Sequence, residues 1–276
     1  MRDCVLVTGA TGFVGVQVVK ALCAQKRRVR AVVRPGKEHL LADKGLSVET
    51  IVTQDLFVEG ADWWKAAYAD VDTVVHAAWY AEVGKHQNSP KNVDCLLGTL
   101  TAGKEAVANH VRRFVGIGTF SEYDAKYGAS LSVDMPLLPT NIYESTKVAA
   151  FYVLRDLFKI SEREFLWCRL FSLYGEGEDP RRILAYVRQQ LSAGQVAELT
   201  DGHQVRDFLD VAEAGQQIVE AALGTKQGAV NICSGIPATI RYVVERIADE
   251  YGRRDLLHFG VRQRSATDPL VTVGVK

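Results

Sequence analysis

Short runs of branched apolar residues alternate with longer amphipathic stretches through the first 170 residues of the chain. The apolar runs predict strands at 5–7, 29–33, 48–52, 72–76, 113–117 and 165–171. Apolar positions at helical spacing predict helices near 60–69, 91–110 and 142–159. Strands and helices that alternate at this length build a parallel sheet with helices on both faces. The pattern therefore predicts an α/β fold with a doubly wound parallel sheet.

The pattern changes after residue 172. A loop rich in glycine and acidic residues at 174–180 precedes a predicted helix near 181–193, a strand near 196–199 and a further helix that ends near 223. We assign residues 1–172 with 204–224 to the sheet domain. Residues 173–203 with 225–276 are assigned to a smaller C-terminal lobe.

A glycine-rich turn directly follows the first predicted strand. Gly9, Gly12 and Gly15 are three residues apart, and helical spacing begins immediately afterwards. Gly9 lets the chain turn sharply, Gly12 lets a pyrophosphate approach the backbone, and Gly15 lets the helix pack closely on the sheet. The N–H groups at the start of the helix favour phosphate. The turn therefore predicts a dinucleotide site, to which Thr11, Phe13 and Val14 also contribute.

Composition and charge narrow the possible partners. The 33 basic residues equal the 33 acidic residues, so no overall field attracts nucleic acid or an anionic membrane. No apolar stretch is long enough to cross a bilayer, and the first apolar run is already a strand rather than a signal peptide. The five cysteines are scattered without a C-x-x-C motif, and the six histidines form no metal-ligand pattern. We expect a cytoplasmic protein with reduced thiols and no metal.

Tyr143 and Lys147 are candidate catalytic residues. They stand four residues apart on a predicted helix, so their side chains share one face. A neighbouring ammonium favours the phenolate and lowers the pKa of a phenol toward a value useful for proton transfer. The same spacing also occurs on solvated helix faces. Thr119, directly after the strand predicted at 113–117, would bring a hydroxyl to a substrate carbonyl.

Six segments together carry a family resemblance: TGATGFVG at 8–15, VVHAA at 74–78, FVGIGTFSEYD at 114–124, YESTK at 143–147, RLFSLYGEGED at 169–179 and VRDFLDV at 205–211. In their order and spacing the sequence resembles the extended short-chain dehydrogenases/reductases, in the branch of nucleotide-sugar epimerases, dehydratases and ketoreductases. The resemblance implies a Rossmann-like sheet domain with a smaller C-terminal substrate-binding lobe. It also implies a homodimer that pairs through the helices near 91–110 and 142–159.

The resemblance assigns the catalytic roles. In that family a tyrosine, a lysine and a serine or threonine support hydride transfer between the nicotinamide and a substrate carbon. The matching residues here are Tyr143, Lys147 and Thr119. Tyr143 would exchange the hydroxyl proton, Thr119 would polarise the carbonyl, and Lys147 would also hold the ribose hydroxyls of the cofactor.

Further cofactor contacts follow from the same match. Asp55 and Leu56 correspond to the adenine site, and His76, Ala77 and Ala78 to the neighbourhood of the nicotinamide ribose. The alternative for Asp55 is a turn-forming role. We interpret His76 as a packed histidine rather than a catalytic one.

Arg34 indicates the kind of cofactor. Relatives that prefer NAD tend to carry an acidic residue at the end of the second strand, where this chain has Arg34, with Lys37 close behind. Two cations here would attract a 2′-phosphate, which favours NADP and leaves NAD possible. The alternative is a solvated arginine that closes a strand.

Arg206 points to a phosphorylated substrate. It matches the family arginine that clamps a substrate diphosphate, and a planar guanidinium suits bidentate phosphate contact. The alternative is an ion pair with Asp207 or Asp210. Either Arg181 or Arg182 could extend the basic patch, and we take Arg182 as the candidate. The remaining candidates for substrate contact are Thr119, Phe120, Ser121 and Ser172.

Two departures from the family pattern limit the activity. In sugar 4,6-dehydratases an Asp-Glu pair follows the catalytic threonine, whereas Phe120 and Ser121 follow it here and Glu122 comes one place late. Dehydration is therefore not expected. The chain also ends at Lys276, before a helix with which typical members continue, so we expect a reduced lobe or a lost tail.

These features favour an NADPH-dependent reductase of a 4-keto-(6-deoxy)hexose nucleotide. The first alternative is a nucleotide-sugar 4-epimerase that retains NAD. Non-sugar carbonyls are also known substrates of this scaffold, but they would leave Arg206 without a diphosphate. The alternative from another class is a non-catalytic NADP(H)-binding sensor or scaffold, which the presence of all three catalytic residues disfavours.

Overall fold

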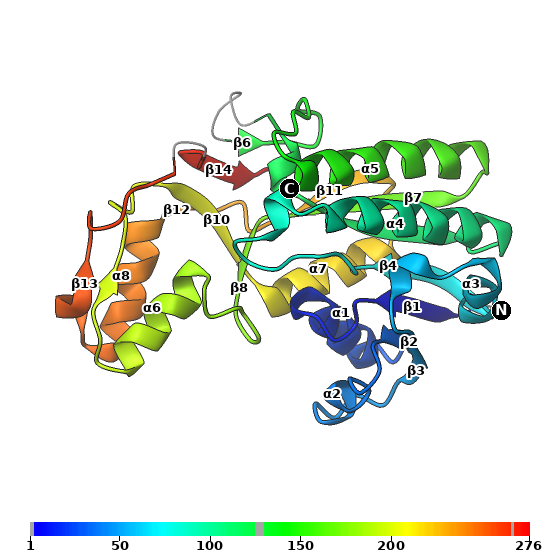
Figure 1. Ribbon diagram of the computed structural model, residues 1–276, viewed down its shortest axis with the longest axis horizontal. Helices are drawn as coiled ribbons and strands as arrows, with labels where there is room; N and C mark the ends of the chain where they lie inside the picture. Colours follow the sequence, from blue (N-terminus) through cyan, green and yellow to red (C-terminus); the bar gives the residue numbers. More distant parts are fainter. Residues whose placement is uncertain (1–2, 125–129, 266–267) are drawn as a thin grey trace.

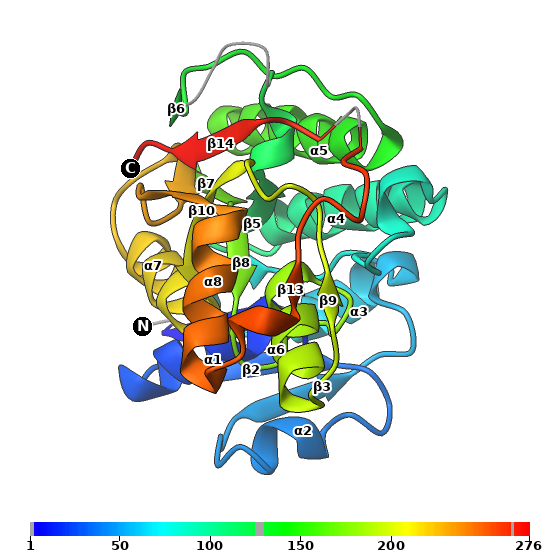
Figure 2. The same ribbon diagram turned by 90° about the vertical axis from the view of Figure 1, so that its left-hand side faces the viewer.

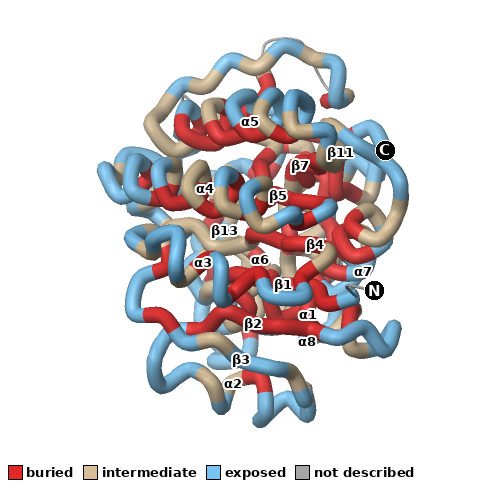
Figure 3. Tube along the Cα trace, turned by 90° about the vertical axis from the view of Figure 1, so that its right-hand side faces the viewer, coloured by how far each residue is buried: buried red, intermediate tan, exposed pale blue. Residues whose placement is uncertain are grey.

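The computed structural model describes residues 3–124, 130–265 and 268–276. Seven parallel strands of this described chain form the large sheet, in the order β11-β7-β5-β4-β1-β2-β3. Their bounds are β1 (Cys4–Thr8), β2 (Arg28–Val33), β3 (Glu49–Val52), β4 (Val71–His76), β5 (Arg113–Thr119), β7 (Glu164–Leu170) and β11 (Gly228–Ile232). Apart from the edge strands, these strands are almost wholly buried, as their apolar runs predict (Figure 3).

Helices cover both faces of this sheet (Figure 1). One face packs against α1 (Phe13–Ala24) and α7 (Val211–Leu223), which contact each other. The other face packs against α3 (Ala61–Ala67), α4 (Lys91–Ala108) and α5 (Ile142–Ile160). A short α2 (His39–Ala42) lies between β2 and β3. The doubly wound α/β prediction is confirmed.

A smaller lobe lies at the left end of the molecule in Figure 1 and faces the viewer in Figure 2. Its own core joins α6 (Ile183–Ser192) and α8 (Ile240–Tyr251) to the paired strands β9 (Ala197–Glu198) and β13 (Leu257–His258). A second sheet lies between this lobe and the large sheet. It contains β6 (Ser130–Leu131), β8 (Ser172–Tyr174), β10 (Val205–Asp210), β12 (Pro237–Thr239) and β14 (Val271–Gly274).

Strands β10 and β11 lie elsewhere than the sequence-based domain assignment places them, as does the short β6, which pairs with β14 in the second sheet although it lies within 1–172. β11 extends the large sheet by pairing in parallel with β7, although it lies within 225–276, the range assigned to the lobe. β10 belongs to the second sheet, although it lies within 204–224. All three are short strands whose sheet is decided by long-range pairing, which local hydrophobic patterning does not encode.

The parallel arrangement determines where a site can form. The carboxyl ends of β1, β4 and β5 lie at one edge of the sheet, because neighbouring strands run in the same direction. In open α/β sheets, ligands bind at this edge. The glycine turn after β1, the 77–90 loop after β4 and the segment after β5 therefore converge there. No helix of the described ranges is both long and apolar enough to cross a membrane.

Candidate active site

The glycine turn has the close contacts that its spacing predicts. Gly9 has φ +63°, and a Cβ there would lie 2.8 Å from the amide nitrogen of Ala78. A Cβ at Gly15 would lie 2.8 Å from the carbonyl carbon of Gly9 and closer still to its oxygen. Gly15 thus allows close packing of α1 on the turn itself, rather than on the sheet as the sequence suggested. Gly12 is exposed, and within the described part of the chain a Cβ added there would meet the Gly9 oxygen, at 3.2 Å, and no other atom within 4 Å.

These residues fit a dinucleotide. Gly12 caps α1 without a side-chain hydrogen bond, and the first turn of α1 carries no acidic residue. The N-terminal N–H groups of α1 are therefore available to a phosphate, which the helix dipole favours. Thr11 lies in the turn, while Phe13 and Val14 start α1 and pack partly against the core.

Thr119, Tyr143 and Lys147 come together at the same edge. Thr119 ends β5, and its hydroxyl lies close enough to the Tyr143 hydroxyl on α5 to oppose the rise in the pKa of that phenol. Lys147 lies one turn further along α5, with its Nζ 6.0 Å from the centre of the Tyr143 ring. The His86 ring, from η2 (His86–Asn88), contacts the Tyr143 ring at right angles, with the ring centres 4.8 Å apart. Asn141 caps the start of α5 by accepting from the N–H of Glu144, which fixes where this helix begins.

Lys147 is deeply buried. Its Nζ donates to the carbonyl of Ile117 at 2.6 Å and lies 3.7 Å from the centre of the Trp79 ring. Burial lowers the pKa of Lys147 to about 7, although Glu122 and Cys95 act in the opposite direction. Near neutral pH the ammonium and the neutral amine are therefore both populated.

The expected effect of Lys147 on Tyr143 is not found. Burial, followed by the charge of Glu122, raises the pKa of Tyr143 above its ordinary value. The sequence-based argument counted the neighbouring ammonium but not the desolvation of the phenol, which here dominates. Tyr143 therefore keeps its proton at neutral pH.

His76 is a packed residue, as interpreted from the sequence. One ring nitrogen lies 3.0 Å from the Thr8 hydroxyl, and the other lies 2.9 Å from the Thr99 hydroxyl. Burial lowers the pKa of His76 to about 3. Ala77 and Ala78 follow it and donate their N–H groups to the carbonyl and the hydroxyl of Thr8. This join between β1 and β4 holds the glycine turn beside the 77–90 loop.

The candidate residues for the adenosine end are separate from the catalytic group. Arg34 and Lys37 are exposed in a turn closed by a hydrogen bond from the Lys37 N–H to the Arg34 carbonyl. Neither has an ion-pair partner among the described residues. The Asp55 side chain accepts a hydrogen bond from the N–H of Phe57, as the alternative turn-forming role requires. Leu56 is buried in the core.

Arg206 forms an ion pair that the sequence did not predict. Its side chain is mostly buried and donates to Asp268 at 2.6 Å, whereas the sequence considered Asp207 or Asp210 as partners. Asp207 instead accepts from the N–H groups of Ser234, Gly235 and Gly274, and Asp210 caps α7. Asp268 lies 62 residues away in the chain, so only β10–β14 pairing brings it near Arg206. Arg264 is close enough to add a second positive charge beside Arg206.

Of the two arginines before α6, Arg182 is the one whose charge acts on Tyr143. Both arginines have acidic partners. Arg182 lies 3.5 Å from Glu178, while Arg181 pairs with Asp179 at 2.7 Å and reaches Glu82 in the 77–90 loop at 3.8 Å. The other substrate candidates lie at the same edge. Phe120 and Ser121 belong to η3 (Phe120–Glu122) directly after β5, and Ser172 begins β8.

The loop after β8 ties the lobe to the sheet domain. Glu176 pairs with Lys20 on α1 and with Lys44 beyond α2, each at 2.5 Å. These two ammonium groups lower the pKa of Glu176 to about 2. Gly177 lies close enough to Phe13 that an added Cβ would be 3.9 Å from its ring. The lobe therefore closes over the start of α1.

Trp79, Glu122 and Arg169 are site residues that the sequence analysis did not assign. Trp79 packs on the Lys147 ammonium and donates from its indole nitrogen to Asn92. Glu122 and Arg169 form a fully buried ion pair next to Thr119. Arg169, a charged residue within the apolar strand sequence FLWCRL, was the available signal, since such residues are rarely buried without a partner.

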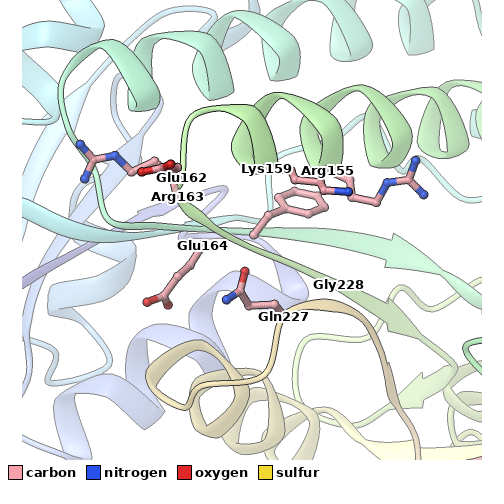
Figure 4. Close-up of a pocket in the computed structure, with 8 residues that line it drawn as sticks. Arg155, Lys159, Glu162, Arg163, Glu164, Gln227 and Gly228 are labelled. Atoms are coloured by element: carbon pink, nitrogen blue, oxygen red, sulfur yellow. The ribbon is translucent and has the colours of Figure 1, made fainter.

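A surface cavity at the opposite edge of the sheet is separate from this site (Figure 4). It is lined by Arg155, Lys159, Glu162, Arg163, Glu164, Phe165, Gln227 and Gly228. Glu164 begins β7, whereas the catalytic group lies at the carboxyl ends of the strands. Within the described ranges, no group of three or more His, Cys, Asp or Glu side chains could hold a metal ion.

Comparisons with known proteins agree with this geometry. Residues 5–233 match the model of the NAD dependent epimerase/dehydratase family. The chain is 22% identical to a dTDP-6-deoxy-L-talose 4-dehydrogenase (NAD(+)) of Aggregatibacter actinomycetemcomitans, over 99% of each chain.

Solved structures show the same fold. A UDP-N-acetylglucosamine 4-epimerase of Methanobrevibacter ruminantium superposes with a TM-score of 0.88 at 20% identity, over 99% of this chain and 89% of the other. A UDP-glucose 4-epimerase of Thermus thermophilus in complex with NAD gives a TM-score of 0.84 at 21% identity, over 99% and 90%. With its glycine turn, its Thr-Tyr-Lys group and a family match over most of its length, the chain belongs to the NAD dependent epimerase/dehydratase family and is an enzyme of the extended short-chain dehydrogenase/reductase type.

Proposed function

We propose that this enzyme reduces a 4-keto-(6-deoxy)hexose nucleotide with hydride from NADPH. The observation that carries the proposal is the approach of the Thr119 hydroxyl to Tyr143, with Lys147 one helical turn away, at the edge where the glycine turn lies. The cofactor, when bound, supplies or accepts a hydride at the nicotinamide. The chain's own residues supply the proton and the orientation.

The state of Tyr143 supports the reductive direction. Because its pKa is raised, Tyr143 is a protonated phenol that can donate to the oxygen of a reduced carbonyl. The Thr119 hydroxyl, next to it, would donate a hydrogen bond to the same oxygen and polarise the carbonyl. Lys147 would hold ribose hydroxyls and place positive charge beside the phenol as it loses its proton.

Dehydration has no support from the geometry. Glu122, the nearest carboxylate after Thr119, is wholly buried and engaged with Arg169 and Trp167. It therefore offers no acid or base to an elimination.

The cofactor preference rests on Arg34 and Lys37. Both cations are exposed in one turn at the end of β2, where a 2′-phosphate would lie in a family member. The talose dehydrogenase is named for NAD(+) and the Thermus thermophilus epimerase structure is a complex with NAD, so NAD remains the alternative.

The substrate class rests on Arg206, Arg182 and Arg264. Arg206 is presented on β10 with its guanidinium oriented by Asp268, and Arg264 adds charge nearby. Such a pair suits a diphosphate. Arg182 adds positive charge close to Tyr143.

A 4-epimerase with retained NAD is the second candidate. Several relatives and solved structures are named as UDP-sugar 4-epimerases, and the same Thr-Tyr-Lys group serves both reactions. The dTDP-6-deoxy-L-talose 4-dehydrogenase, which matches along its full length, is named for net oxidation at C4 and supports the oxidoreductase proposal. A non-catalytic sensor is the weakest candidate, because the full catalytic group is assembled.

We also propose a homodimer that pairs through α4 and α5. These helices carry exposed apolar side chains at Val93, Leu97, Tyr152, Val153 and Ile160. Apolar residues gathered on neighbouring helices are typical of a subunit contact.

One panel tests the activity. Nucleotide-linked hexoses and their 4-keto derivatives are supplied with NADPH or NADH, and absorbance and sugar products are followed. We expect NADPH consumption with a 4-keto substrate; epimer formation without net cofactor consumption would support the epimerase instead. Tyr143→Phe should lower turnover by about a thousandfold while leaving NADPH binding within about twofold, because only the proton donor is lost. Wild-type turnover by this variant would refute the assignment.

A further inference from the structure

A buried ion pair joins η3, at the end of β5, to the neighbouring strand β7. Arg169 Nε donates to Glu122 Oε2 at 2.7 Å, and the two side chains are 1% and 0% exposed. Taking two charges out of water costs several kcal/mol per ion before their attraction is counted, so such a pair is weak evidence for a gain in stability. Its position next to Thr119 suggests another reason for its presence.

Every oxygen of the Glu122 carboxylate is occupied. Oε1 accepts from the backbone N–H of Thr119 at 2.9 Å and from the indole N–H of Trp167 at 3.0 Å. The Thr119 hydroxyl in turn accepts from the N–H of Ser121 at 3.2 Å, which completes a capping box around η3. The orientation of the catalytic hydroxyl is therefore tied to the position of this carboxylate.

Arg169 is held from the other side. Its Nη1 donates to the Tyr123 hydroxyl at 3.1 Å, and that hydroxyl donates to Asn231 at 2.6 Å. Asn231 donates to the carbonyls of Leu131 and Val275. The network runs from the end of β5 through β7 and β11 to the second sheet, so the Glu122 carboxylate cannot move independently of the two sheets.

Two glycines of β5 make room for this network. A Cβ at Gly118 would lie 2.5 Å from Glu122 Oε1 and closer still to the Trp167 indole nitrogen. A Cβ at Gly116 would meet the six-membered ring of the same indole. The G-x-G spacing places both positions on one face of β5, where the indole lies across them.

The same carboxylate acts on both catalytic groups of α5. It favours the ammonium form of Lys147 and disfavours the phenolate form of Tyr143. The Lys147 ammonium is surrounded by aromatic rings: Trp79 at 3.7 Å, Trp167 at 5.9 Å and Tyr143 at 6.0 Å. Among the described residues, the other titratable or charged groups near Lys147 or Tyr143 are Cys95 of α4, His76 of β4, His86 of η2, Glu144 of α5 and Arg182 before α6.

We propose that Glu122, held in place by Arg169, is a positioning residue for the reaction. It fixes the Thr119 backbone and supplies the buried negative charge that favours the ammonium form of Lys147 beside Tyr143. This role rests on the proposed oxidoreductase function. It differs from a purely structural role because it makes the pH dependence of the site depend on one carboxylate.

The test compares two variants with a matched control. Glu122→Gln keeps the shape and the acceptor for Thr119 but removes the charge. Glu122→Gln/Arg169→Met also removes the cation that the first change leaves unpaired, so it protects against a simple failure to fold. The control is Glu164→Gln, which removes the carboxylate paired with buried Arg113 at the opposite ends of the same two strands (Figure 4).

Two readouts are measured between pH 5 and 9: the kcat for a 4-keto substrate and the affinity for NADPH from fluorescence titration. Loss of a nearby opposite charge shifts a pKa by about one unit or more. With Lys147 near 7 in the native chain, both Glu122 variants should lose about tenfold in kcat at pH 8 but only about twofold at pH 6. The midpoint of the fall in NADPH affinity should move down by about one pH unit. Glu164→Gln should lower the melting temperature and leave both midpoints in place.

Unchanged midpoints in both Glu122 variants would overturn the proposal and leave the pair as a structural contact. Equal losses at pH 6 and pH 8, or a matching shift in Glu164→Gln, would overturn it as well. If the wild-type enzyme turned over no sugar nucleotide, the proposed activity would fail. The NADPH midpoints would still decide whether Glu122 controls Lys147.

Discussion

Replacing each of two glycines in the glycine turn by alanine should separate folding from cofactor binding. Gly15→Ala places a Cβ 2.8 Å from the carbonyl carbon of Gly9, where carbon atoms normally stay about 3.5 Å or more apart. The backbone of the turn or of α1 must shift, and overpacking of this kind typically costs about 1–3 kcal/mol. For a chain of this size that lowers the melting temperature by about 3–10 °C.

Gly12→Ala should behave differently. Its φ of −80° and ψ of 171° suit alanine, and the added Cβ has one close neighbour, the Gly9 oxygen at 3.2 Å. Alanine is a poorer N-cap than glycine, so we expect a loss of about 0.5–1 kcal/mol in stability. The methyl group would stand at the exposed start of α1, where the dinucleotide phosphates are expected, and should weaken NADPH binding at least tenfold, or about 1.4 kcal/mol.

The assay pairs thermal unfolding without cofactor with fluorescence titration of NADPH. Gly60→Ala serves as the control, because Gly60 also caps a helix and an added Cβ there meets no atom within 4 Å among the described residues. If Gly12→Ala bound NADPH as tightly as the wild type, the phosphates would not approach at Gly12 and the reasoning would fail. If Gly15→Ala melted at the wild-type temperature, the close packing of α1 on the turn would be refuted.

Two further predictions address the cofactor and the pH dependence of stability. Arg34→Asp should weaken NADPH binding about tenfold or more and NADH binding much less, because it removes a charged contact to the 2′-phosphate. The titrations are run at one salt concentration, with Arg27→Asp, just before the other end of β2, as the control. Equal losses for both cofactors would exclude that contact. His76 has a folded pKa of about 3 against an unfolded value of 6.5, so between these values the unfolded chain binds more protons and stability falls as the pH falls. We expect His76→Gln to lower the slope of unfolding free energy against pH by about 1.4 kcal/mol per pH unit, as measured by urea unfolding between pH 4 and 6. An unchanged slope would mean that His76 is protonated in the folded protein.

The strand and helix pattern was predictable because it depends on residues that lie close together in the sequence. Apolar runs and helical spacing marked nearly every element of the sheet domain, and the three glycines marked the turn after β1, since both signals depend on neighbours within a few residues. The helix position of Tyr143 and Lys147 followed from their four-residue spacing in the same way. The family resemblance then supplied Thr119, which the structure brings into contact with Tyr143.

Long-range contacts decided the rest. The sheet to which β10 and β11 belong, and the partner of Arg206, depend on pairing between segments tens of residues apart. Nothing local distinguishes Asp268 from Asp207 or Asp210 as that partner. Which of the two arginines before α6 acts on Tyr143 through its charge was likewise decided only in the folded chain.

The electrostatic state of the site also belongs to the tertiary structure. From the sequence, a lysine beside a tyrosine predicts a lowered pKa for the phenol. In the structure, burial of both groups instead raises the pKa of Tyr143 and lowers the pKa of Lys147. In the sequence, Glu122 lies one position later than the glutamate expected of a dehydratase. Only the folded chain shows that its carboxylate is buried and hydrogen-bonded to Arg169 and Trp167. Residue spacing determines which groups meet, whereas desolvation depends on everything packed around them, and that is decided by the whole fold.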